Sequence, residues 1–416
     1  MDTKWEMTTE RRPGLRLLIG KLPRPGIPLT ITDPWGNVVS IKSGSKPEYG
    51  PGGFETPIWH KGVYTIRFLD QTFYVEIRDE TVIVTFTERP IEEKEKARLV
   101  STWLFRSQAK DLLARLESTP EYQGIFQMEE WETERINDIP IRILGRTGAR
   151  VTILGVGGYH ISIPPDPEVG IRIIRTAIDE GINFLDNAWS YHQGESERIM
   201  GRALRDGYRE KVFLMTKNHG RDGATFRSQL EESLQRLQTD YIDLLQFHEI
   251  IQEGEPDRIF SEGAIEEAIK AREAGKIRFI GFTGHRWPYL LRQMLDKDFP
   301  WDTAQLPVNL LDFHYRSFTQ EVLPLLTARG IGIIGMKSLA GGEIFKAGVT
   351  AKEAISYALS LPIHTLVVGM DSLEILSQNL EIVRVWTPLT GWERNRLLEQ
   401  VAPWAEDGRL EFYKTG

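Results

Sequence analysis

The chain has 416 residues, a formal net charge of −8 and no cysteine. Its lysines and arginines are scattered, which argues against nucleic acid as a partner, and the lack of cysteine excludes disulfides and thiolate metal sites, so no metal is expected. The first residues contain no apolar segment, and no uncharged run of about eighteen residues occurs later, so we expect a soluble cytoplasmic protein without a membrane contact.

The first part of the chain has the pattern of short strands. Between Leu15 and Thr87, β-branched and aromatic runs are separated by turn signals such as Pro34-Trp35-Gly36-Asn37. The runs are Leu17–Ile19, Leu29–Thr32, Val38–Ile41, Val63–Phe68, Phe73–Ile77 and Val82–Phe86. They predict a small all-β sandwich domain over residues 1–89. Its partner is unknown, and forming a homo-oligomer or covering a neighbouring domain is favoured over carbohydrate binding.

A helical linker is expected next, over residues 90–138. Apolar residues recur at three- and four-residue steps between Pro90 and Ser118, which is typical of an amphipathic helix. Residues 119–138 are mixed and acidic. We expect this region to connect the sandwich to a larger domain over residues 139–416.

From residue 139 onward, strand and helix patterns alternate after a predicted hairpin over Ile139–Thr152. The predicted strands are Ile153–Val156, Phe184–Asp186, Val212–Thr216, Leu244–Phe247, Ile277–Phe282, Thr303–Leu306, Ile331–Gly335 and Thr365–Val368. The predicted helices are Glu168–Glu180, Glu195–Arg205, Thr225–Leu237, Ala264–Glu273, Pro288–Leu295, Gln320–Ala328, Ala351–Ser360 and Leu373–Val383. This alternation favours an α/β fold, a closed (β/α)8 TIM barrel. An open dinucleotide-binding sheet is the weaker alternative, because Gly155-Val156-Gly157-Gly158 is followed by Tyr159-His160 and lacks the glycine fingerprint.

Three ionisable residues close consecutive predicted strands. Asp186, Lys217 and His248 follow one another at equal intervals of 31 residues, and Tyr191 lies shortly after the first of them. In a barrel the strand ends converge on one mouth, so these side chains are expected to meet. Lys217 would stabilise the phenolate of Tyr191 and lower its pKa, while Asp186 would keep the lysine charged. With His248 orienting a carbonyl, the set predicts a proton donor for carbonyl reduction or, in reverse, alcohol oxidation.

Each of these residues alone has a plainer explanation. A single lysine or aspartate at a strand end is usually a solvated charge, a tyrosine can cap a core, and a histidine can be a hydrogen-bonded core residue. The joint pattern favours a functional site, since four suitable residue types would otherwise have to coincide by chance on three consecutive strand ends.

The same region carries a resemblance to a known family. The segments Asn183–Tyr191, Gly194–Glu197 and Asp240–His248 resemble the signature of the aldo-keto reductases, and the similarity covers about Ile139–Val383. It implies a (β/α)8 barrel, NAD(P)H bound across its C-terminal face, and hydride transfer to an aldehyde or ketone. The implied catalytic residues are Asp186, Tyr191, Lys217 and His248. Tyr191 would be the general acid.

The resemblance also implies a set of cofactor contacts. Thr283 and Gln305 would hold the nicotinamide carboxamide, because hydroxyl and amide groups match its donor and acceptor. Small residues after the seventh strand would let the backbone approach the pyrophosphate, with Lys337 meeting its charge. Ser372 would lie near the ribose. The expected cofactor residues are Thr283, Gln305, Met336, Lys337, Ser338, Leu339, Gly341, Gly369, Ser372, Gln378 and Asn379.

NADP(H) is the expected cofactor, with NAD(H) as the alternative. Relatives that need the 2′-phosphate commonly have Arg or Lys where this chain has Asp371 and Ser372, and a carboxylate there would repel a phosphate. Met336 replaces a tyrosine that stacks on the nicotinamide in many relatives, and its thioether can cover the ring.

The predicted mouth is polar and aromatic. Trp189, His192 and Tyr159 are expected to contact the small-molecule substrate, with His160 and His285 nearby. This lining suits a hydroxylated carbonyl or sugar-like compound. The alternative function is a catalytically weak nucleotide-sensing or regulatory subunit whose β-domain binds a partner. A nucleotide sensor would need only the cofactor contacts. The presence of all four predicted catalytic residues therefore favours an enzyme over a sensing subunit.

Overall fold

The computed structural model describes short strands between residues 6 and 98, and then residues 134–389, 391–405 and 407–415. The chain divides into two compact units, Met1–Glu130 with Thr390–Glu399, and Trp131–Leu389 with Gln400–Gly416. Among the described residues, no helix combines the length and apolar character needed to cross a membrane.

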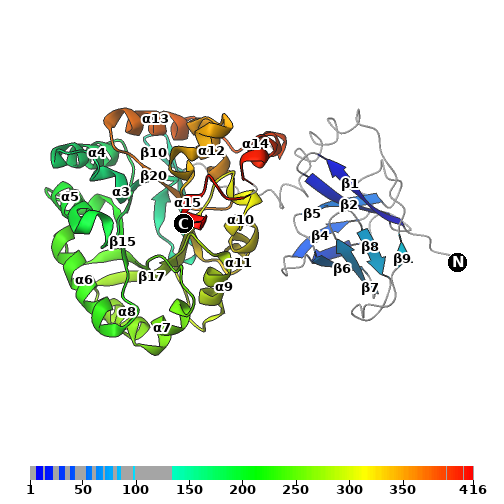
Figure 1. Ribbon diagram of the computed structural model, residues 1–416, viewed down its shortest axis with the longest axis horizontal. Coiled ribbons are helices and arrows are strands. Elements are labelled where there is room, and N and C mark those ends of the chain that lie inside the picture. The colour runs from blue at the N-terminus through cyan, green and yellow to red at the C-terminus, as the bar shows by residue number, and fades with distance from the viewer. Residues whose placement is uncertain are drawn as a thin grey trace. The chain divides into compact units, whose positions relative to one another are not determined.

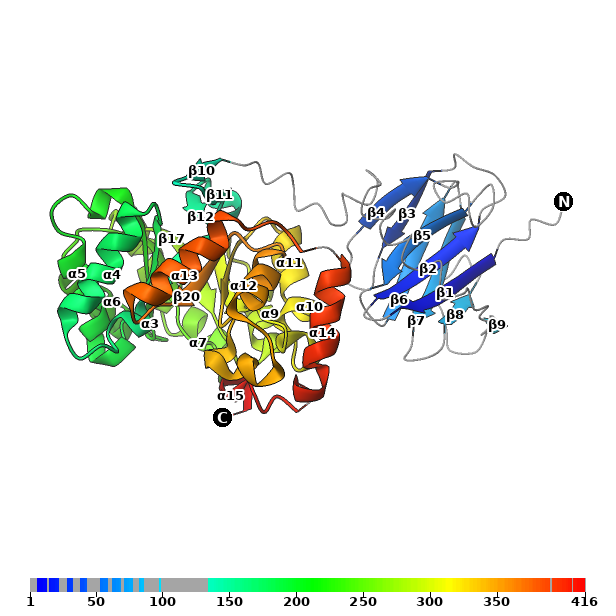
Figure 2. The same ribbon diagram turned by 90° about the horizontal axis from the view of Figure 1, so that it is seen from above.

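The first unit contains two antiparallel sheets (Figure 2). The smaller sheet has the order β1 (Glu6–Arg12), β2 (Leu15–Lys21), β5 (Gly53–Ile58). The larger has the order β4 (Val38–Lys42), β3 (Pro28–Thr32), β6 (Gly62–Phe68), β7 (Gln71–Ile77), β8 (Val82–Thr85), β9 (Ala97–Arg98). Leu29 and Ile31 on β3, with Tyr64 and Ile66 on β6, are buried, so alternate residues of paired strands face one core.

The antiparallel sheets expected ahead of the barrel are therefore confirmed. The predicted connecting helix is wrong at Ala97–Arg98, which form strand β9 and pair with β8 of the larger sheet. The rest of that helix and the acidic linker as far as residue 133 lie outside the described residues. The domain boundaries at residues 89 and 138 remain predictions.

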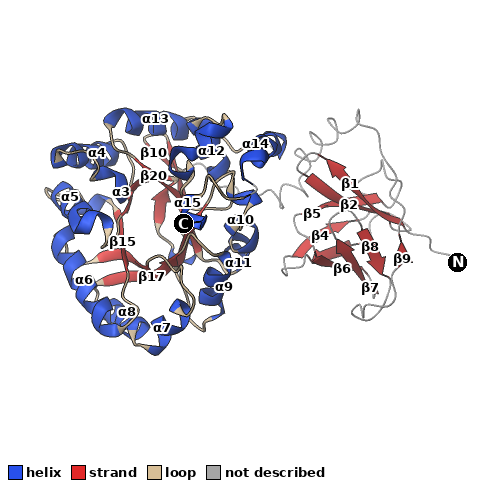
Figure 3. Ribbon diagram, in the orientation of Figure 1, coloured by secondary structure: helices blue, strands red, loops and turns tan. Residues whose placement is uncertain are grey.

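The second unit is a closed barrel of eight parallel strands, which confirms the predicted fold (Figure 1). The strands are β13 (Leu154–Gly157), β14 (Phe184–Asp186), β15 (Phe213–Asn218), β16 (Ile242–Phe247), β17 (Ile277–Thr283), β18 (Thr303–Pro307), β19 (Gly332–Met336) and β20 (Thr365–Gly369). The helices are α3 (Gly158–Ile161), α4 (Pro167–Asp179), α5 (Glu195–Ala203), α6 (Gly223–Leu237), α7 (Glu255–Ser261), α8 (Ala264–Glu273), α9 (Pro288–Asp296), α10 (Phe318–Glu321), α11 (Leu323–Ala328), α12 (Ala351–Leu359), α13 (Leu373–Arg384) and α15 (Phe412–Thr415). A further helix, α14 (Gly391–Ala405), is divided between the two units, with Gln400–Ala405 in the second. Figure 3 shows helices surrounding the strands.

One predicted helix is divided in the structure. Gln320–Ala328 was expected to be continuous, but α10 ends at Glu321 and α11 begins at Leu323. Pro324 lies in the first turn of α11, where its missing N–H costs nothing, whereas inside a continuous helix it would remove a backbone hydrogen bond.

The amino ends of the barrel strands are closed by the hairpin β11 (Ile139–Ile143) and β12 (Arg150–Thr152). Leu144 and Val151 pack with inward residues of the strands, including Phe184 and Phe213, in one buried cluster. Figure 2 shows this hairpin at one end of the barrel and α15 at the other. The carboxyl ends of the strands are therefore the face that can carry a site.

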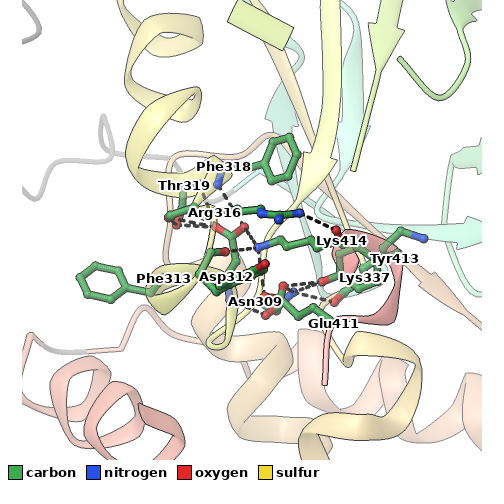
Figure 4. Close-up of polar contacts among 12 residues, drawn as sticks. Asn309, Asp312, Phe313, Arg316, Phe318, Thr319, Lys337, Glu411, Tyr413 and Lys414 are labelled. Carbon is green, nitrogen blue, oxygen red and sulfur yellow. Dashed lines mark hydrogen bonds and ion pairs between the residues drawn. The ribbon is translucent and has the colours of Figure 1, made fainter. Parts of the chain in front are cut away.

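The C-terminal segment is fixed to that face by a buried ion cluster (Figure 4). Lys414 is fully buried, and its Nζ lies 2.6 Å from Asp312 Oδ1 and 3.0 Å from Glu411 Oε2. Tyr413 donates its hydroxyl to Glu411 at 2.6 Å and accepts from the Asn309 amide at 2.9 Å. Residues some hundred positions apart in the sequence are thereby joined beside the loop after β18.

Replacing Lys414 with Met should destabilise the fold strongly. The substitution keeps most of the apolar stem but leaves two buried carboxylates without their cation, which costs about 3–5 kcal/mol of unfolding free energy. The matched control is Lys346→Met, because Lys346 makes an exposed ion pair with Glu343 and should change stability by less than about 1 kcal/mol. Urea unfolding of both variants measures the difference, and equal effects would contradict the structural role of Lys414.

Candidate active site

The structure brings the four residues predicted as catalytic to one mouth of the barrel. Asp186 is the last residue of β14, Lys217 lies near the end of β15, and His248 follows β16 directly. These strands are consecutive neighbours in the barrel, so their carboxyl ends meet. Tyr191 opens the short 3-10 helix η3 (Tyr191–Gly194) and reaches the same place.

Lys217 is the centre of the arrangement. Its side chain is 1% exposed, and Nζ lies 2.8 Å from Asp186 Oδ1, 2.8 Å from the Asn187 carbonyl oxygen and 3.2 Å from Tyr191 Oη. An ammonium has three donors, and each has an acceptor here. The lysine is therefore held in one position, pointing at the phenol.

Aromatic rings enclose the Tyr191 side chain. The rings of Tyr159 and His248 meet the Tyr191 ring edge to face, with centroid separations of 5.5 Å and 5.6 Å. The backbone directly after it is unusual, since His192 and Gln193 both have positive φ angles, 47° and 56°. Strained backbone of this kind is often found at functional sites.

The electrostatics of Tyr191 differ from the expectation. From the sequence, Lys217 is predicted to lower the phenol pKa, but burial raises the pKa of Tyr191 well above its usual value, and Asp186 and Glu249 raise it further. The reason is that the buried ammonium is already matched by Asp186, so its charge does not offset the loss of solvent around the phenol. The protonated phenol is the form that this site favours.

His248 is a neutral imidazole in this environment. Burial lowers its pKa well below the usual value, and the nearby charge of Lys217 lowers it further. The buried Nδ1 atom has no hydrogen-bond partner among the described residues. A neutral imidazole with a ring nitrogen that has no partner can donate a hydrogen bond to a ligand or accept one from it.

Two of the predicted nicotinamide contacts lie beside the residues predicted as catalytic. Gln305 donates from Nε2 to Asp186 Oδ2 at 2.8 Å, which leaves its buried Oε1 without a partner among the described residues. Thr283 lies opposite Gln305 in the β17–β18 pairing and is also buried. Gln305 thus holds Asp186 from the side away from Lys217 and keeps one acceptor for a ligand amide.

The predicted pyrophosphate loop follows β19 and has a strained backbone. Lys337, Ala340, Gly341 and Gly342 have positive φ angles of 59°, 48°, 69° and 94°. Burial lowers the pKa of Lys337, and its ammonium lies over the Tyr413 ring at 5.0 Å. Met336 and Leu339 are half-buried and Ser338 is buried.

The predicted adenosine end lies at β20 and α13. Ser372 caps α13 by accepting from the Ile375 backbone N–H at 3.2 Å. Asn379 is buried and its Nδ2 has no partner among the described residues, whereas Gln378 is exposed. Gly369 is required next to His160, because a Cβ there would lie 2.2 Å from the His160 Nδ1 atom.

The predicted substrate residues separate into two groups. Tyr159 and His192 lie together, with ring centroids 4.6 Å apart and His192 Nε2 3.0 Å from the Tyr159 carbonyl oxygen. Trp189 instead donates its indole N–H to Glu232 of α6 at 3.0 Å, and the Arg236 guanidinium lies over its ring. Trp189 therefore fastens the loop to α6.

Sequence reasoning missed two contributors to the mouth. His219 directly follows β15, two residues after Lys217, and its ring centroid lies 4.4 Å from that of His248. Its position at a strand end was a usable signal. The ring of Tyr413 packs edge to face on that of His285, with the centroids 5.9 Å apart. No local sequence pattern predicted that a residue near the C-terminus would lie at the mouth.

The chain is similar to known oxidoreductases. The sequence model described as the Aldo/keto reductase family matches residues 153–358. L-galactose dehydrogenase from Arabidopsis thaliana is 33% identical over 224 residues, covering 50% of this chain and 68% of that protein. The uncharacterized oxidoreductase YrpG from Bacillus subtilis (strain 168) is 33% identical over 223 residues, covering 48% of this chain and 66% of that protein.

A solved structure agrees with the sequence relatives. The aldo-keto reductase AKR11C1 from Bacillus halodurans (holo form) is 26% identical with a TM-score of 0.55, covering 63% of this chain and 96% of that chain. The matched part of the chain thus spans about two thirds of the length of the curated relatives and nearly all of the solved structure. With an eight-stranded parallel barrel and these similarities, the chain belongs to the aldo/keto reductase family.

Proposed function

We propose that the protein is an NAD(P)H-dependent oxidoreductase that reduces an aldehyde or ketone, with Tyr191 as the general acid. The observation that carries this proposal is the 3.2 Å contact between Lys217 Nζ and Tyr191 Oη at the mouth of the barrel. A protonated phenol beside a fixed ammonium can release its proton to a carbonyl oxygen, because the ammonium stabilises the phenolate that forms.

The other residues support this proton transfer. Asp186 and the Asn187 carbonyl hold Lys217, and Gln305 holds Asp186. The neutral imidazole of His248 contributes a hydrogen bond that orients the carbonyl. Bound cofactor supplies the hydride. In reverse, the Tyr191 phenolate accepts a proton from an alcohol.

The chain's own groups fit a dinucleotide. Gln305 Oε1 and Asn379 Nδ2 are buried polar atoms without partners among the described residues, and burying such atoms is costly unless a ligand pairs with them. The strained loop 336–342 offers backbone N–H groups and the Lys337 ammonium for a pyrophosphate. NADP(H) is the proposed cofactor, with NAD(H) as the alternative.

The proposed substrate is a hydroxylated carbonyl compound. Tyr159 and His192 supply polar groups next to Tyr191, and the similarity to a protein named L-galactose dehydrogenase supports a sugar-like molecule. Comparing kcat/KM for sugars and for apolar aldehydes of similar size tests this class, and a preference for apolar aldehydes would contradict it.

Replacing Tyr191 with Phe should abolish most turnover. Loss of a positioned general acid typically lowers kcat by roughly 100- to 10,000-fold. The control is Tyr208→Phe, because Tyr208 binds Asp179 on the exposed surface, away from the mouth. Steady-state kinetics of both variants measure the effect. Turnover by Tyr191→Phe at the wild-type rate would refute the assignment. Tight NADPH binding without any turnover by the wild-type protein would instead support the nucleotide-sensing subunit.

The two directions of the reaction should respond differently to pH. Since burial raises the pKa of Tyr191, the phenol stays protonated at neutral pH, and reduction should be nearly constant from about pH 6 to pH 9. Alcohol oxidation needs the phenolate and should rise with pH by up to about tenfold per unit. Profiles of kcat in both directions measure this. A reduction rate that falls above neutral pH would show that the phenol pKa is lowered, as the sequence predicts.

Cofactor choice should depend on Asp371. If the 2′-phosphate lies near this carboxylate, Asp371→Asn removes a repulsion of about 1 kcal/mol and should tighten NADPH binding about fivefold, leaving NADH binding unchanged. Tryptophan fluorescence during titration with each cofactor measures both affinities. The same improvement for NADH and NADPH would show that the carboxylate does not face the 2′-phosphate.

A further inference from the structure

Four potential metal ligands gather at the mouth of the barrel, from the loops after three consecutive strands. His219 follows β15, His248 and Glu249 follow β16, and His285 follows β17. The ligand atoms of His219, His248 and Glu249 all lie within 4.8 Å of one another. His285 Nε2 lies 3.9 Å from Glu249 Oε1, and His219 Nε2 lies 3.9 Å from Glu249 Oε2.

The three imidazole rings are of the right chemical type for a metal site, because a neutral imidazole nitrogen offers a lone pair to the ion. The buried His248 Nδ1 has no hydrogen-bond partner among the described residues.

Glu249 makes no direct ion pair with a lysine or arginine of the described residues. Lys217 is paired with Asp186 at 2.8 Å, and Arg221 is paired with Glu255 at 2.9 Å. Lys217, Arg221 and Lys337 interact with the Glu249 carboxylate only at longer range, whereas His219 and His285 face its two oxygens. A metal ion can therefore bind this carboxylate without breaking an ion pair to a lysine or arginine.

The backbone of Glu249 is held in an unfavourable conformation. Its φ angle is 50°, a region that costs energy for a residue with a side chain. Arg221 stabilises this turn by donating to the backbone carbonyls of His248 and Glu249. The fold thus maintains strain that places the carboxylate among the imidazoles.

We propose that His219, His248, Glu249 and His285 form a binding site for a divalent transition-metal ion of the zinc type. Imidazole and carboxylate are the ligands that such ions take in the absence of cysteine. With metal–ligand bonds of about 2.1 Å, tetrahedral ligand atoms lie about 3.4 Å apart. The ligand atoms of His219, His248 and Glu249, which lie within 4.8 Å of one another, must therefore approach by up to about 1.4 Å. His285 faces the other oxygen of Glu249 at 3.9 Å and must turn toward the ion to complete the set. The sequence predicts no metal, and this proposal departs from that prediction.

Metal binding competes with one hydrogen bond that His219 already makes. His219 Nε2 lies 3.0 Å from Ser190 Oγ, and coordination through this atom displaces that hydrogen bond. The ion also uses the imidazole that packs on Tyr191, at 5.6 Å between ring centroids. Zinc and a carbonyl substrate therefore compete, and zinc inhibits reduction.

Titration of the untagged full chain with Zn²⁺, followed by isothermal calorimetry, tests the site. We expect one ion per chain. Glu249→Gln keeps the side-chain shape but removes the charge, and His285→Gln removes a ligand. Each substitution should weaken Zn²⁺ binding at least about tenfold. Loss of a group that only supports a metal ligand typically weakens metal binding by about 10- to 100-fold, and loss of a ligand should cost no less. Glu253→Gln is the matched control, because Glu253 is an exposed carboxylate bonded to Tyr289 and should leave the affinity unchanged.

Spectroscopy with Co²⁺ supplies a second readout. Cobalt in the proposed nitrogen and oxygen environment should give visible absorption bands that Glu249→Gln abolishes, with circular dichroism showing that the variant is folded. Tyr191→Phe should bind Zn²⁺ like the wild type, which separates this site from the proposed reductase function. Failure of the wild type to bind, or equal binding by wild type, Glu249→Gln and His285→Gln, would overturn the proposal.

Discussion

The site depends on one buried ammonium. Removing the charge of Lys217 from water is costly unless acceptors compensate it, and the end of the neighbouring strand β14 with the loop after it supplies a carboxylate, a carbonyl and a phenol oxygen. Gln305 reaches Asp186 from across the barrel and fixes the second carboxylate oxygen. The geometry that holds the ammonium is therefore the same geometry that aims it at Tyr191.

Burial acts in opposite directions on the groups around that ammonium. It raises the pKa of the Tyr191 phenol and lowers the pKa of His219, His248 and His285, because in each case the neutral form loses less on leaving water. The mouth accordingly combines a proton donor with three uncharged imidazoles. Glu249 adds a carboxylate to these rings, and Lys217, Arg221 and Lys337 interact with it at longer range without a direct ion pair.

Sequence reasoning was sufficient where the physics is periodic. Strands and helices of a barrel repeat, so the eight alternating strand and helix patterns predicted the fold, and the equal spacing of Asp186, Lys217 and His248 predicted that these residues lie together. It failed where the outcome depended on distant partners. The pKa of Tyr191 depends on how far the charge of Asp186 offsets that of Lys217 and on how deeply the phenol is buried. Neither the charge balance nor the burial can be predicted from the local sequence pattern.

The C-terminal segment shows how far such dependence extends. Tyr413 touches His285 at the mouth and lies under the Lys337 ammonium of the proposed pyrophosphate loop, and Phe412 lies against Gly341 in that loop. Both aromatic residues are held by Lys414 and its buried carboxylates (Figure 4). Because Gly341 has a positive φ and little space beside it, the loop conformation and the tail position constrain each other. One buried cation thus organises the groups proposed to react, and a second fixes the segment that joins the proposed substrate mouth to the proposed pyrophosphate loop.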